Sequence, residues 1–347
     1  MNKQNSFSIS FGLQPDNYIE RVVEQRQVVE DFEMPISPSM VYVLNGVRGC
    51  GKTVLLSSIA DHFKDSDDWF VVDASSKHNI LELIVASIYE QAKVKRLFVE
   101  KSLNFSFHGV SINLKGSNPI SHIEILIAKV LEELKKQNKR VLVTIDEADN
   151  SEEMRYFISC YQTLIRDKYP VYLLMTGLYE NIDKLQNDKA LTFLARAPKI
   201  NLGPLSLATI AARYKQYLGV DEQTSIEMAK LTNGYAYAYQ VLGFLFYKNN
   251  FKTLNDNLII EFDQYLKSYV YDFIYRRLSN NEQLILKAFD NGKQEKYSEI
   301  SKKANISERS LSVYRVGLIR KGLIESPTHG YLRLTLPRFA AYLSLED

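Results

Sequence analysis

Residues 46–53 read GVRGCGKT, and this stretch decides the fold because it satisfies the pattern G-x-x-x-x-G-K-[S/T] at every fixed position. Its glycines allow the loop to curl, so that successive backbone N–H groups point at phosphate oxygens. A helix that starts at the end of the loop adds the positive end of its dipole. The stretch therefore predicts a phosphate-binding loop, the P-loop, between a strand and a helix.

The residues on either side of the P-loop agree with this prediction. Residues 41–44 form a short apolar run typical of a buried strand, and apolar residues recur at helical spacing from residue 54 to residue 59. A glycine turn without a ligand is the alternative, and the strand and helix around the loop disfavour it. The residues expected to contact the nucleotide are Gly46, Arg48, Gly49, Cys50, Gly51, Lys52, Thr53 and Val54.

Two residues at the end of the P-loop have distinct expected roles. Lys52 is expected to bring its positive charge to the β- and γ-phosphates, and the hydroxyl of Thr53 is expected to ligate Mg²⁺. These roles predict a protein that binds ATP or GTP with magnesium.

A second motif follows at residues 141–147, which read VLVTIDE: an apolar strand that ends in two carboxylates. Asp146 is expected to hold Mg²⁺, directly or through water. Glu147 is expected to act as the general base that polarises the water attacking the γ-phosphate. A solvated acidic turn is the alternative. Together with the P-loop, the motif predicts a Mg²⁺-dependent ATPase that uses Lys52 and Glu147 in catalysis.

The first two hundred residues alternate between strand and helix patterns. Strands are expected at residues 41–44, 69–72, 141–145, 171–175 and 199–202, with helices between them. This order predicts an α/β fold with a doubly wound parallel sheet and right-handed crossovers, over residues 1–204. Between residues 95 and 118, apolar residues alternate around His108-Gly109, which predicts a surface hairpin insertion.

The rest of the chain has a different pattern. At 347 residues the chain is long enough for two or three domains. Strand signals vanish after Pro204, and residues 205–279 predict an all-α domain that would form a lid. Residues 280–347 then show helix, helix, turn, helix and a returning hairpin, the element order of a winged helix-turn-helix.

The composition is that of a protein able to bury a core, with 46% hydrophobic and 24% charged residues. A formal net charge of +2 creates no strong field, so nucleic-acid binding would need a local basic face. The two cysteines form no Cys-x-x-Cys pair, the first residues are polar, and the longest apolar run is too short to cross a bilayer. We therefore expect a reduced, cytoplasmic protein without a membrane partner.

Taken together, the motifs resemble an AAA+ ATPase of the Orc/Cdc6-like, archaeal-type branch with a C-terminal winged helix. The stretches that carry the resemblance include residues 173–178 (LLMTGL), 196–198 (RAP) and 202–206 (LGPLS), besides the two motifs above. The resemblance implies ATP and Mg²⁺ as ligands. It also implies a homo-oligomer in the ATP state.

Four further residues receive roles from this resemblance. Thr176 would be the polar residue called sensor 1, which orients the attacking water, and Arg196 would reach the γ-phosphate, commonly that of a neighbouring subunit. Tyr18 and Ile19 would contact the adenine. The alternatives are a strand-end cap for Thr176, a surface arginine at a helix end for Arg196, and core packing for Tyr18 and Ile19. No counterpart of the family's sensor 2 arginine stands in residues 235–249.

The second helix of the predicted winged helix provides candidate contacts to double-stranded DNA. These are Arg309, Ser310, Ser312 and Arg315. From residue 280 onward, eleven Lys and Arg stand against eight Asp and Glu, a small excess for a DNA-binding module. The expected function is therefore ATP hydrolysis that controls assembly on DNA. Two alternatives stay open: a STAND-like signalling or defence NTPase switch whose winged helix contacts protein, and a non-enzyme that keeps the nucleotide as a structural cofactor.

Overall fold

The chain divides into two compact units, each with its own hydrophobic core. The helical unit comprises Met1–Glu20, Gly46–Val54 and Asn201–Asp347, and the sheet unit comprises Arg21–Asn45 and Leu55–Ile200. The computed structural model describes residues 5–10, 12, 14–76, 79–90, 105–107, 110–112, 123–188, 191–251, 253–290 and 293–346.

The sheet unit is built on a five-stranded sheet in the order β2-β5-β6-β1-β7. The pairs β2/β5, β5/β6 and β6/β1 are parallel, so the sheet has the parallel topology that the strand and helix alternation predicts. All five expected strands are present. Their bounds are β1 Val41–Asn45, β2 Trp69–Ala74, β5 Arg140–Ile145, β6 Val171–Gly177 and β7 Lys199–Asn201.

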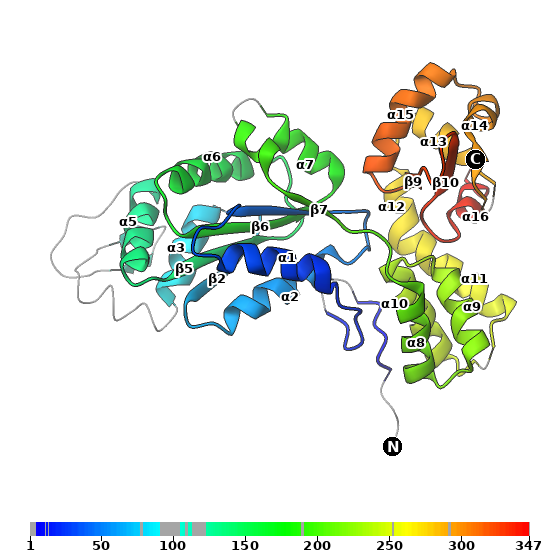
Figure 1. Cartoon of the computed structure of the whole chain (residues 1–347), viewed down its shortest axis with the longest axis horizontal. Helices are drawn as coiled ribbons and strands as arrows, with labels where there is room; N and C mark the ends of the chain where they lie inside the picture. The colour runs from blue at the N-terminus through cyan, green and yellow to red at the C-terminus, as the bar shows by residue number, and fades with distance from the viewer. Residues whose placement is uncertain are drawn as a thin grey trace. The chain divides into compact units, whose positions relative to one another are not determined.

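Helices cover both faces of this sheet, which confirms the doubly wound P-loop fold (Figure 1). One face carries α1 Val22–Glu33 and α2 Lys52–Lys64, and the other carries α3 Ile80–Glu90, α5 Ile123–Lys136, α6 Glu152–Arg166 and α7 Tyr179–Gln186. The sequence pattern did not predict α1, because only three of its residues are buried. A 3-10 helix, η1 Thr192–Arg196, leads into β7.

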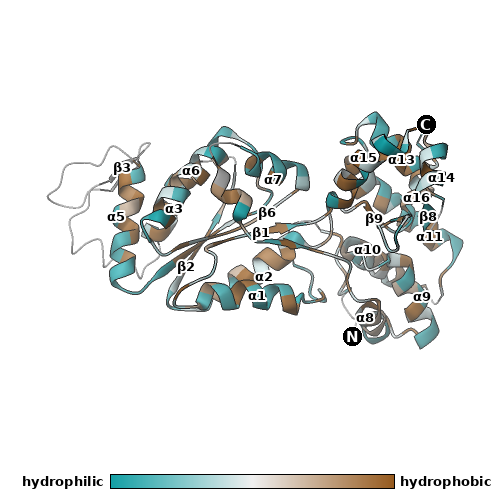
Figure 2. Ribbon diagram, turned by 45° about the horizontal axis from the view of Figure 1, so that its top comes forward, coloured by the Kyte–Doolittle hydropathy of each residue, from teal (hydrophilic) through white to brown (hydrophobic). Residues whose placement is uncertain are grey.

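The two faces of the sheet are packed by different side chains. On the face of α1 and α2 the packing is aromatic, with ring centroids 4.3 Å apart for Phe63 and Trp69 and 4.9 Å apart for Trp69 and Tyr172. The other face is mainly aliphatic, and apolar residues run along the central strands (Figure 2). Because both faces are covered, strands such as 141–145 are apolar without alternation.

A short antiparallel pair joins β3 Phe105–Phe107 and β4 Val110–Ile112, with Phe105 opposite Ile112. This pairing confirms the strands of the predicted hairpin. His108-Gly109 and the remaining parts of the predicted insertion, residues 95–104 and 113–118, lie outside the described residues.

After Pro204, the helical unit contains the predicted run of helices. Side chains cap three of them: Ser206 accepts from Thr209 N, Asp221 from Thr224 N and Asn255 from Leu258 N. The elements are α8 Leu207–Leu218, α9 Glu222–Thr232, α10 Ala236–Lys248, α11 Asp256–Leu266, the π-helical turn η2 Lys267–Tyr271 and α12 Asp272–Tyr275.

The tyrosines at the start of α10 belong to the core of this unit. Tyr235, Tyr237 and Tyr239 are 5%, 8% and 1% exposed, which confirms core packing rather than an open stacking platform for bases. Phe7, from the N-terminal segment, packs its ring 5.5 Å from that of Tyr239. The N-terminal segment therefore folds onto the helices of the C-terminal half.

The last part of the helical unit, from residue 280, follows the element order that the sequence predicts. The hydroxyl of Ser307 accepts a hydrogen bond from Ser310 N, as expected for a helix N-cap. The two-residue β8 and the short α16 were not predicted, because neither is long enough to show a period. The elements are α13 Asn280–Lys287, β8 Glu295–Lys296, α14 Tyr297–Lys303, α15 Glu308–Arg320, β9 Ile324–Glu325, β10 Tyr331–Leu334 and α16 Phe339–Leu343.

The three strands of this part form an antiparallel sheet in the order β8-β10-β9. The domain boundaries expected after residues 204 and 279 stay predictions. No helix in the described part of the chain combines the length and the apolar character that crossing a membrane requires.

Candidate nucleotide site

The P-loop lies in the helical unit and has the curl that its sequence predicts. Gly49 and Gly51 adopt φ of 78° and 96°, a region that side chains disfavour. Helix α2 starts at Lys52, whose Nζ donates to the carbonyl oxygens of Gly46 at 2.9 Å and Val47 at 3.1 Å. The ammonium group therefore lies within the curl of the loop, at the helix N-terminus.

The backbone carbonyl groups of two P-loop residues accept hydrogen bonds from the start of α10. The sequence did not predict this contact. The Tyr235 hydroxyl donates to the carbonyl oxygen of Arg48, and the Tyr237 N–H donates to that of Gly49 at 3.0 Å. A Cβ at Gly49 would collide with the Tyr235 hydroxyl, so the close approach also requires glycine there. A pattern of alternating tyrosines is the only signal the sequence offers for this contact.

Tyr18 and Ile19, the expected adenine contacts, lie in the helical unit with the P-loop and are half-buried. The neighbouring Asn17 is buried: its carbonyl oxygen accepts from the Tyr239 hydroxyl at 3.2 Å, and its Oδ1 accepts from Gln240 Nε2 at 3.1 Å. The segment is thereby anchored to α10. Contact of Tyr18 or Ile19 with a base stays a prediction.

The acidic motif lies in the sheet unit and forms a small network with Thr176. The buried Thr176 hydroxyl donates to Asp146 Oδ1 at 2.5 Å and accepts from the Glu147 N–H at 3.0 Å. The Glu147 N–H also lies 3.1 Å from Asp146 Oδ1. The structure thus brings Thr176 to Asp146, thirty positions earlier in the sequence, and to the adjacent Glu147, and Thr176 holds both carboxylate residues in place.

Glu147 is held in an uncommon backbone conformation. Its φ is 54°, which costs a residue with a side chain on the order of 1 kcal/mol. The hydrogen bonds to Thr176 compensate, since Ala148 N–H also donates to the Thr176 carbonyl oxygen at 2.7 Å. The turn leaves the Glu147 side chain exposed beyond the end of β5, where it is free to meet solvent.

The strand register places this network at the edge of the sheet where β1 ends. Asn45, the last residue of β1, pairs with Gly177 of β6, and Ile145 of β5 pairs with Met175 of β6. Neighbouring strands are about 4.8 Å apart, so β5 runs roughly 10 Å from β1. Gly46 follows Asn45 directly in the chain. Parallel sheets bind their ligands at this carboxyl edge.

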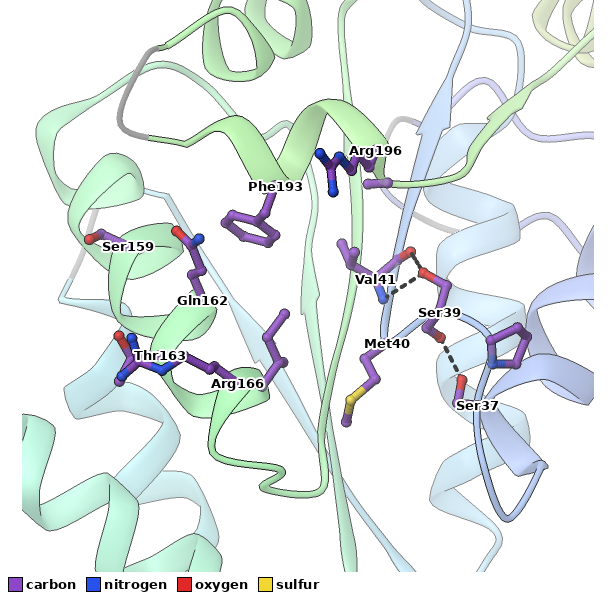
Figure 3. Close-up of a pocket in the computed structure, with 13 residues that line it drawn as sticks. Ser37, Ser39, Met40, Val41, Ser159, Gln162, Thr163, Arg166, Phe193 and Arg196 are labelled. Carbon is purple, nitrogen blue, oxygen red and sulfur yellow. Dashed lines mark hydrogen bonds between the residues drawn. The ribbon is translucent and has the colours of Figure 1, made fainter.

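Arg196 occupies a different position in the sheet unit. It is exposed at the end of η1 and lines an open pocket of about 650 Å³, together with Phe193, Arg166 and Val41 (Figure 3). Val41 is the first residue of β1, so Arg196 lies at the amino edge of the sheet, opposite to the edge with Asp146. The structure therefore does not place Arg196 with the acidic network of its own chain.

The expected DNA contacts lie on α15. Arg309, Ser310 and Ser312 are exposed, whereas Arg315 is half-buried. The same helix also exposes an apolar stripe: Val313, Val316 and Ile319, at 71%, 43% and 38% exposure. The outer face of α15 is therefore mixed, with cationic and polar residues near its start and apolar residues along its middle.

Comparisons with known proteins agree with the observed fold. Residues 18–193, just over half of the chain, match the model of a family described as an ATPase domain predominantly from Archaea. Residues 268–343 match a domain of unknown function. No curated protein matches the sequence of the chain.

Several solved structures have a similar fold. The Walker-type ATPase PABY2304 of Pyrococcus abyssi superposes with a TM-score of 0.68 at 17% identity, over 95% of this chain and 96% of that one. The ORC2 protein of Aeropyrum pernix, in ADPNP and ADP complexes, gives 0.59 at 14% identity over 97% and 96% of the two chains. Cdc6p of Pyrobaculum aerophilum gives 0.50 at 16% identity over 97% and 96%. At these identities the likeness establishes the fold.

Proposed function

Because this chain belongs to the family of ATPase domains found predominantly in Archaea, we propose that it is a Mg²⁺-dependent ATPase whose nucleotide state controls its C-terminal part. We further propose that residues 280–347 form a winged helix-turn-helix domain that engages double-stranded DNA. Residues 1–204 form the nucleotide-binding domain in this proposal, and residues 205–279 form its helical lid. Under this proposal, ATP binding and hydrolysis switch assembly on DNA.

The observation that carries the ATPase proposal is the network of Thr176, Asp146 and Glu147 at the carboxyl edge of the sheet. Glu147 accepts a proton from the water that attacks the γ-phosphate, so that ADP and inorganic phosphate leave. Thr176 keeps the Glu147 backbone in the conformation that points its carboxylate outward. Lys52, at the start of α2, brings its charge to the phosphates.

The donor set suits Mg²⁺, which prefers oxygen ligands: a carboxylate at Asp146 and a hydroxyl at Thr53. These two residues would hold the ion. When bound, Mg²⁺ neutralises charge on the β- and γ-phosphates. The Thr176 hydroxyl donates a hydrogen bond to Asp146 Oδ1, which orients this carboxylate.

The DNA proposal leads to a binding prediction for α15. Arg309→Glu is expected to weaken retention of double-stranded DNA at moderate salt by about tenfold or more, because an attractive phosphate contact becomes repulsive. Filter binding measures this. Lys248→Glu, the same charge change on the exposed end of α10, is the control and keeps wild-type retention. Arg315→Glu is expected to act in the same direction. Equal retention by wild type, Arg309→Glu and Arg315→Glu would contradict the proposal.

A second candidate function is favoured by the apolar stripe of Val313, Val316 and Ile319 on α15. Exposed apolar residues are typical of protein contacts, whereas DNA-binding faces are polar and positively charged. In this candidate the chain is a STAND-like nucleotide switch, and its C-terminal part contacts another protein. Absence of DNA retention by the wild type, together with normal ATP turnover, would select it.

For Arg196, we propose that it acts on the nucleotide of a neighbouring copy, which would explain a homo-oligomer in the ATP state. Arg196→Ala is expected to weaken self-association with a slowly hydrolysed ATP analogue by about tenfold, the worth of one charge-assisted contact. Light scattering with ATP analogue and with ADP measures the change. Arg155→Ala, an exposed arginine of α6 outside the pocket, is the control. A wild type that stays the same monomer with both nucleotides would refute this role.

A further inference from the structure

The contacts on the outside of the P-loop come from sequence-distant parts of the helical unit. Tyr235, at the N-cap of α10, and Phe273, in α12, each touch Arg48. Gly322, which follows α15, backs onto Val47. We propose that Tyr235 and Phe273 are positioning residues for the P-loop, and that the C-terminal segment 268–343 sets nucleotide affinity through Phe273 and Gly322. This inference rests on the proposed function, because ATP is the ligand whose affinity is set.

The hydrogen bond of Tyr235 determines the direction of a P-loop donor. A peptide unit is planar and trans, so the carbonyl of one residue and the N–H of the next point in opposite directions. Because the Tyr235 hydroxyl binds the Arg48 carbonyl, the N–H of Gly49 points away from α10. A directed N–H group is what an anion-binding loop needs.

The backbone of Tyr237 acts on the next peptide unit. Its N–H donates to the Gly49 carbonyl at 3.0 Å, which directs the N–H of Cys50 to the opposite side. That N–H closes a turn on the Val47 carbonyl at 3.3 Å. Two successive peptide units of the loop are thus oriented by α10, and the loop is held in its curl before any ligand arrives.

The Tyr235 hydroxyl is suited to this role because it remains a donor. Its ring is 5% exposed, and burial raises the pKa of the phenol well above its usual value. The Tyr235 N–H donates to the Thr232 carbonyl at 2.9 Å, so the residue is anchored at the start of the helix. Because this donor is already fixed, little conformational entropy is lost when it orients the loop.

The C-terminal segment contacts Arg48 as well, and also its neighbour Val47. The Arg48 guanidinium lies 5.0 Å from the centre of the Phe273 ring, within the range of a cation–π interaction. A Cβ placed on Gly322 would lie 3.6 Å from Val47 Cβ, which is van der Waals contact. In addition, Asn233 Nδ2 donates to the Thr335 carbonyl at 2.7 Å and links the end of α9 to the segment after β10.

Linkage makes these contacts a two-way coupling. If the C-terminal segment preorganises the loop, removing its contacts weakens ATP binding. The coupling free energy is the same in both directions, so ATP binding stabilises the contacts of Phe273 and Gly322 by the same amount. A partner that displaces the C-terminal segment would therefore lower ATP affinity without touching the nucleotide.

The first test measures the affinity of a slowly hydrolysed ATP analogue by calorimetry on the full chain. Tyr235→Phe removes only the hydroxyl and is expected to weaken binding about two- to tenfold. The matched control is Tyr214→Phe, since the Tyr214 hydroxyl also donates to a backbone carbonyl, that of Tyr239, at 2.8 Å in the same core. Both variants lose thermal stability, but only Tyr235→Phe loses affinity. Equal affinities in the two variants would overturn the positioning role.

The second test addresses the C-terminal segment. Phe273→Ala is expected to weaken binding about two- to fivefold, as for an exposed cation–π pair. Tyr269→Ala, one turn earlier and 45% exposed against 47% for Phe273, is the control. Hydrogen exchange adds a second readout: the ATP analogue should slow exchange at residues 318–323 in the wild type and not in Phe273→Ala. Unchanged affinity and exchange in Phe273→Ala would overturn the coupling.

ATP binding by the wild type and by the variants separates the proposed function from this inference. If the wild type binds no ATP, the proposed function fails and this inference fails with it. If the wild type binds ATP and Lys52→Ala does not, while Tyr235→Phe and Phe273→Ala bind normally, only the inference fails.

Discussion

Glu147→Gln is expected to lower ATP turnover by about 10²- to 10⁴-fold while ATP still binds, because the amide keeps the size of the side chain and loses the base. The backbone should be unaffected, since Thr176 holds Glu147 through its N–H and not through its side chain. Phosphate release under saturating ATP and Mg²⁺ measures turnover, and calorimetry with the same variant measures binding.

The control for this prediction is Glu153→Gln, the same chemical change on the exposed first turn of α6. It should hydrolyse ATP at the wild-type rate. Turnover by Glu147→Gln that equals the control would remove Glu147 from the mechanism. A wild type that binds ATP tightly and releases no phosphate, with or without DNA, would instead favour a nucleotide kept as a structural cofactor.

Lys52→Ala is expected to weaken ATP binding by about 10- to 100-fold, the loss of charge-assisted hydrogen bonds to phosphate. The variant should fold normally, because alanine is a good helix former and because the hydrogen bonds of Lys52 within the described residues go to loop carbonyls, those of Gly46 and Val47. Binding of ATP and of ADP should both be measured. The loss should be larger for ATP, whose γ-phosphate adds a contact.

Lys64→Ala serves as the control for Lys52→Ala. Lys64 lies in the last turn of the same helix, α2, where it pairs with Asp61 and Asp73 at the surface. Such pairs contribute little to stability, and this variant should bind ATP like the wild type. Nucleotide binding that survives in Lys52→Ala would mean that the P-loop is not the binding site.

Much of the fold could be predicted because its signals are local. A strand buried on both faces is a short apolar run, as at residues 141–145, and all five strands of the sheet were recognised from such runs. The cap at Ser307 likewise depends on residues three apart. Helix α1 was missed because few of its residues are buried, and the two-residue β8 was missed because it is too short to show alternation.

Only the part of the candidate site that depends on local sequence could be predicted. The P-loop motif needs nothing beyond its own backbone and the helix that follows, so the sequence alone determined the loop, its lysine and the strand that ends in Asp146 and Glu147. These features follow from chemistry within about ten residues.

Tertiary structure alone decided which side chains support that chemistry. Register across β5 and β6 places the Thr176 hydroxyl on Asp146, and the same sheet places Arg196 at the opposite edge. The Tyr235 hydroxyl reaches Arg48 from 187 positions away. Such contacts depend on strand order and on which distant segments of the chain pack together. A pattern of neighbouring residues carries no information about either.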